Sequence, residues 1–81
     1  MSGRFSDSYD LVIQIEPFNE QHKRAWTWHG QPMRELGAVQ NRAKRTVKSY
    51  GKRLLAWKIV LNRLNMITGE VEMSIVEENR L

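Results

Sequence analysis

The sequence predicts an α+β fold of the type ββαββ, in which one helix packs on a four-stranded, mainly antiparallel sheet with the strand order 2-1-3-4. Segments of alternating apolar and polar residues lie on both sides of a segment with helical spacing, and 81 residues suffice for a single domain. We expect residues 9–78 to form this domain, with a flexible N-terminus at 1–8 and a C-terminal tail at 79–81.

The first strand is expected at residues 9–16. Leu11, Ile13 and Ile15 recur at every second position, and the segment is rich in β-branched residues. Pro17 ends the strand because proline has no N–H to donate to a neighbouring strand.

The second strand is expected to be short, at residues 24–29, after a polar loop at 18–23. Trp26 and Trp28 lie two positions apart, so they share one face of that strand. We expect at least one of them to pack under the helix. Gly30 and Pro32 end the strand, and proline suits the first turn of a following helix.

A helix is expected over residues 34–53. Apolar residues are spaced at three, four, four and three positions, which makes one helical stripe: Leu36, Val39, Ala43, Val47 and Tyr50. Gly51 follows the stripe and suits a left-handed C-terminal cap.

Residues 54–64 fit either a helical stripe or a strand face, and the next segment decides between the two. Val71, Met73 and Ile75 alternate after a turn, and a hairpin needs a strand on the other side of its turn. We therefore assign 54–64 to the third strand. A five-residue loop at 65–69 would pair Leu61 with Met73 and Ile59 with Ile75. A right-handed crossover through the helix then gives the order 2-1-3-4.

The residues that carry catalysis in other proteins occur here without a catalytic arrangement. The chain has no cysteine, and two histidines, His22 and His29, which lack metal-binding spacing. The paired carboxylates at 16 and 20 and at 77 and 78 sit at expected strand ends, and Gly51 is not part of a phosphate-binding loop. We expect no enzyme activity, no catalytic residue, no cofactor and no metal.

The charge is distributed unevenly along the chain, whose net charge is +4. Residues 23–63 contain eleven Lys and Arg against one acid, Glu35, whereas both ends of the chain are acidic. Such asymmetry is typical of a protein with an anionic partner. An alternative is that the cations only solvate the exposed side of the helix.

The basic helix is the leading candidate site, as a surface for nucleic acid or for another partner. Its expected contact residues are Arg34, Asn41, Arg42, Arg45, Lys48, Lys52 and Arg53. Trp26 and Trp28 are candidate aromatic contacts, which would stack on bases or form a hot spot for a protein if they are exposed. Trp57 is expected in the core, since it shares a strand face with Ile59.

Two functional hypotheses follow. The first is a small cytoplasmic nucleic-acid-binding or regulatory domain, with DNA or RNA as partner. The alternative is a protein-interaction module without nucleic-acid contact, either a homodimer or an inhibitor or accessory protein of a mobile element. No apolar run approaches the roughly 20 residues of a membrane span, so we expect no membrane partner.

Overall fold

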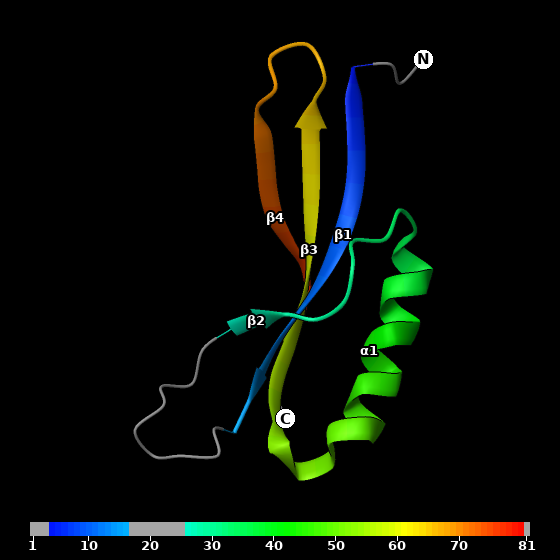
Figure 1. The fold of residues 1–81 in the computed structure, drawn as a ribbon, viewed down its shortest axis with the longest axis vertical. Helices are drawn as coiled ribbons and strands as arrows, with labels where there is room; N and C mark the ends of the chain where they lie inside the picture. Colours follow the sequence, from blue (N-terminus) through cyan, green and yellow to red (C-terminus); the bar gives the residue numbers. More distant parts are fainter. Residues whose placement is uncertain (1–3, 17–25, 81) are drawn as a thin grey trace.

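The computed structural model describes residues 4–16 and 26–80, which form a sheet with one helix on one of its faces (Figure 1). The elements in chain order are β1 (Phe5–Ile15), β2 (Trp26–Trp28), α1 (Leu36–Tyr50), the short 3₁₀ turn η1 (Gly51–Arg53), β3 (Leu54–Asn65) and β4 (Val71–Arg80). The sheet order is β2-β1-β3-β4, and all neighbouring strands are antiparallel. The predicted fold class, strand order and third strand are confirmed.

The hydrophobic core lies between α1 and the two central strands. Its buried residues are Leu11, Ile13, Val39, Ala43, Leu54 and Ile59. Val39 and Ile59 are both 0% exposed, and burying such a side chain stabilises the fold by about 1.5–3 kcal/mol. Trp57, predicted in the core, packs against this cluster but is only partly buried. The helix is therefore held by its apolar stripe, which leaves its other sides to solvent.

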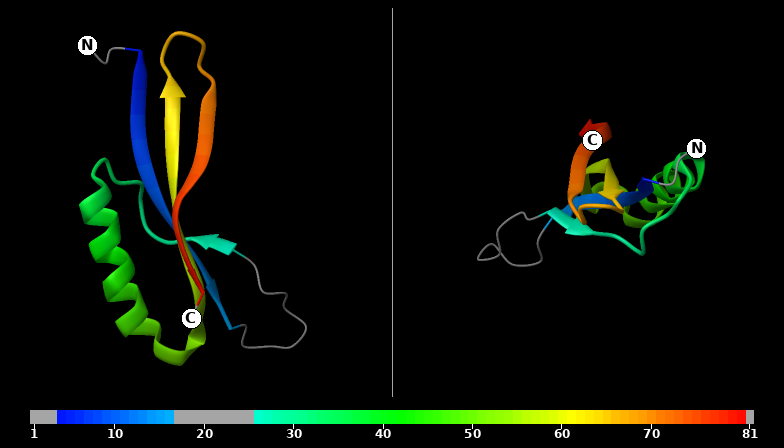
Figure 2. Two further views of the ribbon diagram at one scale, coloured as in Figure 1. Left: turned by 180° about the vertical axis from the view of Figure 1, so that it is seen from behind. Right: turned by 90° about the horizontal axis from the view of Figure 1, so that it is seen from above.

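The sheet extends well beyond the helix. β1, β3 and β4 continue past the N-terminal end of α1 as a three-stranded projection, which Figures 1 and 2 show from opposite sides. The molecule accordingly measures 47 × 26 × 18 Å. In this upper part neither face of the sheet is covered by another described element.

The sheet also begins earlier and ends later in the chain than the sequence predicted. Residues 5–8, expected in a flexible terminus, pair with β3 through the register Phe5–Asn65 to Ser8–Asn62. The polar residues there have distant partners: Asp7 accepts two hydrogen bonds from Arg63, at 2.9 and 3.0 Å. β4 likewise includes residues 79–80, expected in a tail.

The helix is shorter than predicted at both ends. Pro32 is not in its first turn, because Met33 exchanges two backbone hydrogen bonds with Tyr9 and so continues the sheet as an isolated bridge. α1 begins at Leu36 and is followed by Gly51, whose φ of 58° suits glycine. Arg34 therefore precedes the helix, and residues 52 and 53 lie in η1.

The predicted register of the β3–β4 hairpin is wrong by one residue. Asn65 pairs with Glu70 across the turn, since the Asn65 N–H donates to the Glu70 carbonyl at 2.8 Å, so Leu61 lies opposite Ser74 rather than Met73. A shift of one residue moves every side chain to the other face. The alternating apolar residues of β4 consequently point away from α1.

The predicted loop at 18–23 lies outside the described residues, as do residues 24–25 of the predicted second strand.

Candidate functional site

The exposed side of α1 and η1 carries a cluster of cations without acids. We call Lys44, Arg45, Lys48 and Lys52 the cationic helix surface; all four side chains are exposed. The 15 residues of α1 include no Asp or Glu. An ordinary solvated helix mixes charges of both signs, because i,i+4 pairs of opposite sign stabilise it. The cationic helix surface lacks this internal compensation.

The position of these cations follows from the packing of the helix. At about 100° per residue, Asn41 and Arg45 each lie about 160° from the buried Ala43, on the outermost line of the helix. Lys48 lies beside that line in the last turn, where a cation also interacts favourably with the helix dipole. The apolar stripe thus accounts for the outward position of Asn41, Arg45 and Lys48.

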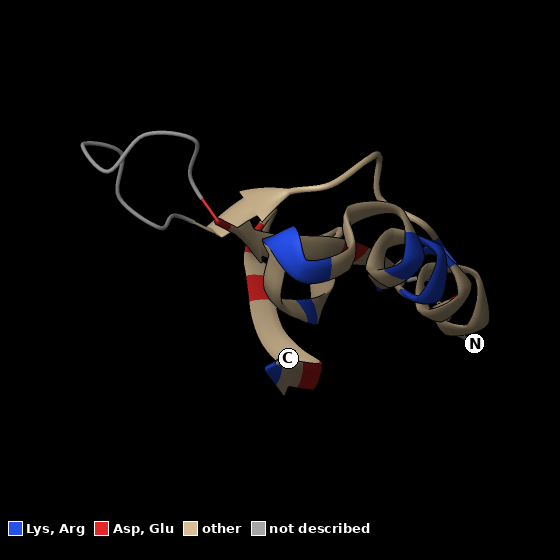
Figure 3. Ribbon diagram, turned by 90° about the horizontal axis from the view of Figure 1, so that it is seen from below, with Lys and Arg blue, Asp and Glu red and all other residues tan. Residues whose placement is uncertain are grey.

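The cationic helix surface is electrostatically unpaired. Arg63 and Asp7 form an ion pair outside α1, and among residues 4–16 and 26–80 no carboxylate lies within 4.0 Å of the four cations. Figure 3 shows basic positions along the helix and the turn after it, while the strands carry acidic positions together with some basic ones. The four charges are therefore available to an external anion.

Three of the remaining predicted contact residues are exposed, and the fourth, Arg42, packs within the chain. Arg34 and Asn41 are exposed, as is Arg53, whose backbone carbonyl accepts a hydrogen bond from the Glu16 N–H at 2.8 Å. Lys44 was absent from the predicted set, although its position one residue after Ala43 places it on the flank of the helix towards β4. A helical wheel of the sequence would have included it.

Arg42 differs from the other predicted contacts because it packs against the connection between β2 and α1. Its Nη1 donates a hydrogen bond to the Gln31 carbonyl at 2.7 Å, and the side chain is half-buried. It also fills the space beside Gly30, where a Cβ atom would lie 2.5 Å from Nη1. Arg42 therefore positions this connection, and its charge is partly committed to a carbonyl within the chain.

Both candidate aromatic residues of β2 lie on the face of the sheet opposite α1. Trp28 pairs with Val12 and Trp26 with Gln14, and these partners alternate with the core residues of β1. The expectation that one tryptophan packs under the helix is therefore wrong. Trp28 is 58% exposed, whereas Trp26 is half-buried, with the Lys58 Nζ 4.3 Å from its ring centroid.

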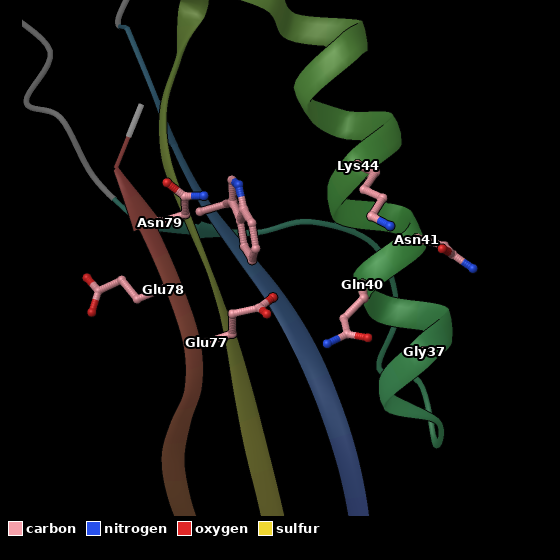
Figure 4. Close-up of a pocket in the computed structure, with 8 residues that line it drawn as sticks. Gly37, Gln40, Asn41, Lys44, Glu77, Glu78 and Asn79 are labelled. Carbon is pink, nitrogen blue, oxygen red and sulfur yellow. The ribbon is translucent and has the colours of Figure 1, made fainter.

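An open groove of about 520 Å³ separates α1 from β4, because the helix covers only β1 and β3 (Figure 4). Gln40 and Lys44 line its helix side, and Glu77 points into it from β4, while Glu78 points away. Trp57 also lines the groove, from the central strand. One acid and one lysine on opposite walls do not form a catalytic pair. The residues that line the groove therefore suggest no particular reaction.

The other candidate catalytic groups are dispersed within the described part of the chain. His29 makes an edge contact with Tyr50, with ring centroids 5.8 Å apart, while His22 and Glu20 lie outside the described residues. No cluster of three or more potential metal ligands occurs among residues 4–16 and 26–80. In the same residues, no helix is both long and apolar enough to cross a membrane.

Comparisons of this chain with protein families, with curated proteins and with solved structures find no match. The candidate site is therefore interpreted from its own geometry and charge.

Proposed function

We propose that this domain binds nucleic acid through the cationic helix surface. The observation that carries the proposal is the concentration of four exposed, unpaired cations on α1 and η1, with no acid in the helix. Cations of this kind neutralise phosphates and release the counterions condensed on a nucleic acid, which is the main source of non-specific affinity.

The shape of the surface suits a duplex. A helix of 15 residues is about 22 Å long and about 10–12 Å wide with its side chains, and the major groove of B-form DNA is about 12 Å wide. Asn41 and Arg45 lie one turn apart on the outermost line, where an amide reads adenine and a guanidinium reads guanine. Lys44, Lys48 and Lys52 flank that line and are placed to contact phosphates.

Fluorescence anisotropy with a labelled generic DNA duplex tests the proposal, with duplex and single-stranded RNA as further probes. At 0.1 M salt each phosphate contact contributes about 8-fold to the affinity, so we expect Arg45→Gln/Lys48→Gln to weaken binding by about 60-fold. Arg4→Gln/Arg80→Gln is the matched control, because it removes the same charge from residues outside the helix. We expect this control to bind within a few-fold of the unmodified chain.

Two results would overturn the proposal. One is the absence of binding to every nucleic-acid probe at 50 mM salt. The other is equal weakening by the two double variants, because the interaction would then depend on net charge and not on the helix. Circular dichroism establishes that each variant retains its fold before affinities are compared.

A further inference from the structure

The face of the sheet opposite α1, which we call the open face, carries large apolar side chains in contact with solvent. Val71 and Met73 are each 57% exposed, and Ile75 is 55% exposed. The observed hairpin register places all three on this face, with Val71 opposite Leu64 and Ile75 opposite Val60. Trp28 belongs to the same face, through its pairing with Val12. An apolar strip of this kind is a feature of interfaces more than of monomer surfaces.

The outer edge of β4 is unprotected over residues 71–75, which precede the bulge at Val76, where the β3–β4 register shifts. β4 is a ten-residue edge strand, and the opposite edge of the sheet is formed by the three residues of β2 and by the part of β1 that β2 does not pair. Natural edge strands are usually blocked by lysine, proline, an inward-facing charge or a covering element. Residues 71–75 contain neither lysine nor proline, and Glu72 is their single charge. Their unpaired backbone groups are ready to accept a further strand.

The chain exposes more surface than a compact monomer of its mass. The accessible surface is 6243 Å², whereas a compact monomer of 9.6 kDa exposes about 5,100 Å². The radius of gyration is 14.5 Å, against about 11.7 Å for a compact domain of this length. The difference of about 1,100 Å² exceeds the roughly 800 Å² that each partner buries in a standard interface, so burial on that scale would leave the chain with an ordinary exposed area.

We propose that a second copy of this chain pairs with β4, antiparallel, around a two-fold axis at Met73. In this register Val71 lies opposite the partner's Ile75, and Glu72 lies opposite the partner's Ser74. The apolar strip formed by Leu64 and Val71 then continues into the partner's Ile75. Homodimers with a two-fold axis are the commonest assemblies of soluble chains, and the same patch serves both copies.

Charge favours an axis at Met73 over axes at the neighbouring residues. Charge also favours the edge of β4 over the cationic helix surface as the place where two copies meet. An axis at Ile75 would place Glu72 opposite the partner's Glu78, and an axis at Ser74 would place Glu70 opposite the partner's Glu78. Like charges directly opposite each other destabilise a strand pair. Two copies, each of net charge +4, also approach more easily through an edge that lacks cations than through the cationic helix surface.

Sedimentation equilibrium without nucleic acid tests the dimer, and Met73→Lys tests its axis. Met73→Lys would place two ammonium groups opposite each other, so we expect the dimer to weaken by at least about 10-fold. Thr27→Lys is the matched control, since Thr27 is exposed on β2, at the opposite edge of the sheet, and gains the same charge. We expect this control to remain dimeric.

Cysteine cross-linking gives a second, independent measurement, because the chain has no cysteine of its own. At the two-fold axis, Met73→Cys brings two thiols close enough to cross-link, because opposed Cα atoms in an antiparallel pair are about 4.5–5.5 Å apart and disulfides join Cα atoms about 4.4–6.8 Å apart. We expect rapid cross-linking of Met73→Cys and slow cross-linking of Thr27→Cys, which lies at the opposite edge of the sheet. A monomer at 100 μM, or a dimer that neither Met73 variant affects, would overturn the inference while leaving the proposed nucleic-acid binding untouched.

Discussion

The dependence of nucleic-acid affinity on salt is the most direct measure of the cationic helix surface. If its four cations each neutralise one phosphate of a duplex, the logarithm of the affinity should fall with the logarithm of the salt concentration with a slope of about −3.6. Raising the salt from 50 to 200 mM would then weaken binding of one helix by about 150-fold. With single strands the expected slope is about −2.8, so the slope also reports the form of the nucleic acid.

Removing two of the four cations should halve the slope. For Arg45→Gln/Lys48→Gln we expect about −1.8 on a duplex, which corresponds to about 12-fold weakening over the same salt range. The assay is a set of anisotropy titrations at four or more salt concentrations, with Arg4→Gln/Arg80→Gln measured in parallel. The control should keep the slope of the unmodified chain, because its two cations lie off the helix.

The slope separates phosphate contact from other causes of binding. An unmodified slope shallower than about −1 would mean that fewer than two phosphates are contacted, which is incompatible with a surface of four cations. A normal slope that Arg45→Gln/Lys48→Gln leaves unchanged would place the contact elsewhere on the chain. Either result would refute the assignment of the helix as the binding surface.

Three further predictions concern stability and titration. Arg42→Ala should lower the free energy of unfolding in urea by about 1 kcal/mol, because it removes the hydrogen bond to the β2–α1 connection, and should change the salt slope by less than Arg45→Gln does. Ile59→Ala should cost about 2–5 kcal/mol in the same assay, since the side chain is 0% exposed in the core; a cost within 1 kcal/mol would contradict its placement. The hydrogen bonds from Arg63 hold the pKa of the Asp7 carboxyl below its ordinary value, so the pair stabilises the fold at neutral pH and this contribution is lost as the pH falls through that lowered pKa. An NMR titration should detect the low pKa and its return towards the ordinary value in Arg63→Gln.

The fold could be predicted because its signals are local. The change from a period of two to a period of 3.6 marks the helix, and the apolar stripe from Leu36 to Tyr50 also identifies the outward side on which Arg45 and Lys48 lie. The third strand needed one further step, since residues 54–64 fit two patterns, and the hairpin requirement resolved them. Each inference used residues within one or two elements.

Most of the errors concern how the strands pair and not which residues form them. Alternation shows that Trp26 and Trp28 share a face, but only their register with β1 decides which face it is. The hairpin loop was wrong by one residue, and that single step moved Met73 from the helix side to the open face. Polar residues 5–8 carry no strand pattern, and they join the sheet through partners such as Arg63, 56 positions away from Asp7.

The two proposed contacts use separate parts of the molecule, which makes their combination measurable. The cationic helix surface lies on the outer side of α1, which packs on one face of the sheet. The proposed axis at Met73 lies on the edge of β4, so a dimer leaves both helices exposed. If both helices of a dimer contact one duplex, twice as many phosphates are neutralised and the slope should steepen to about −7. Met73→Lys should then return the slope to about −3.6 without removing a cation from either helix. A slope near −3.6 in both proteins would mean that each duplex meets one helix, because the dimer geometry would hold the second helix out of reach.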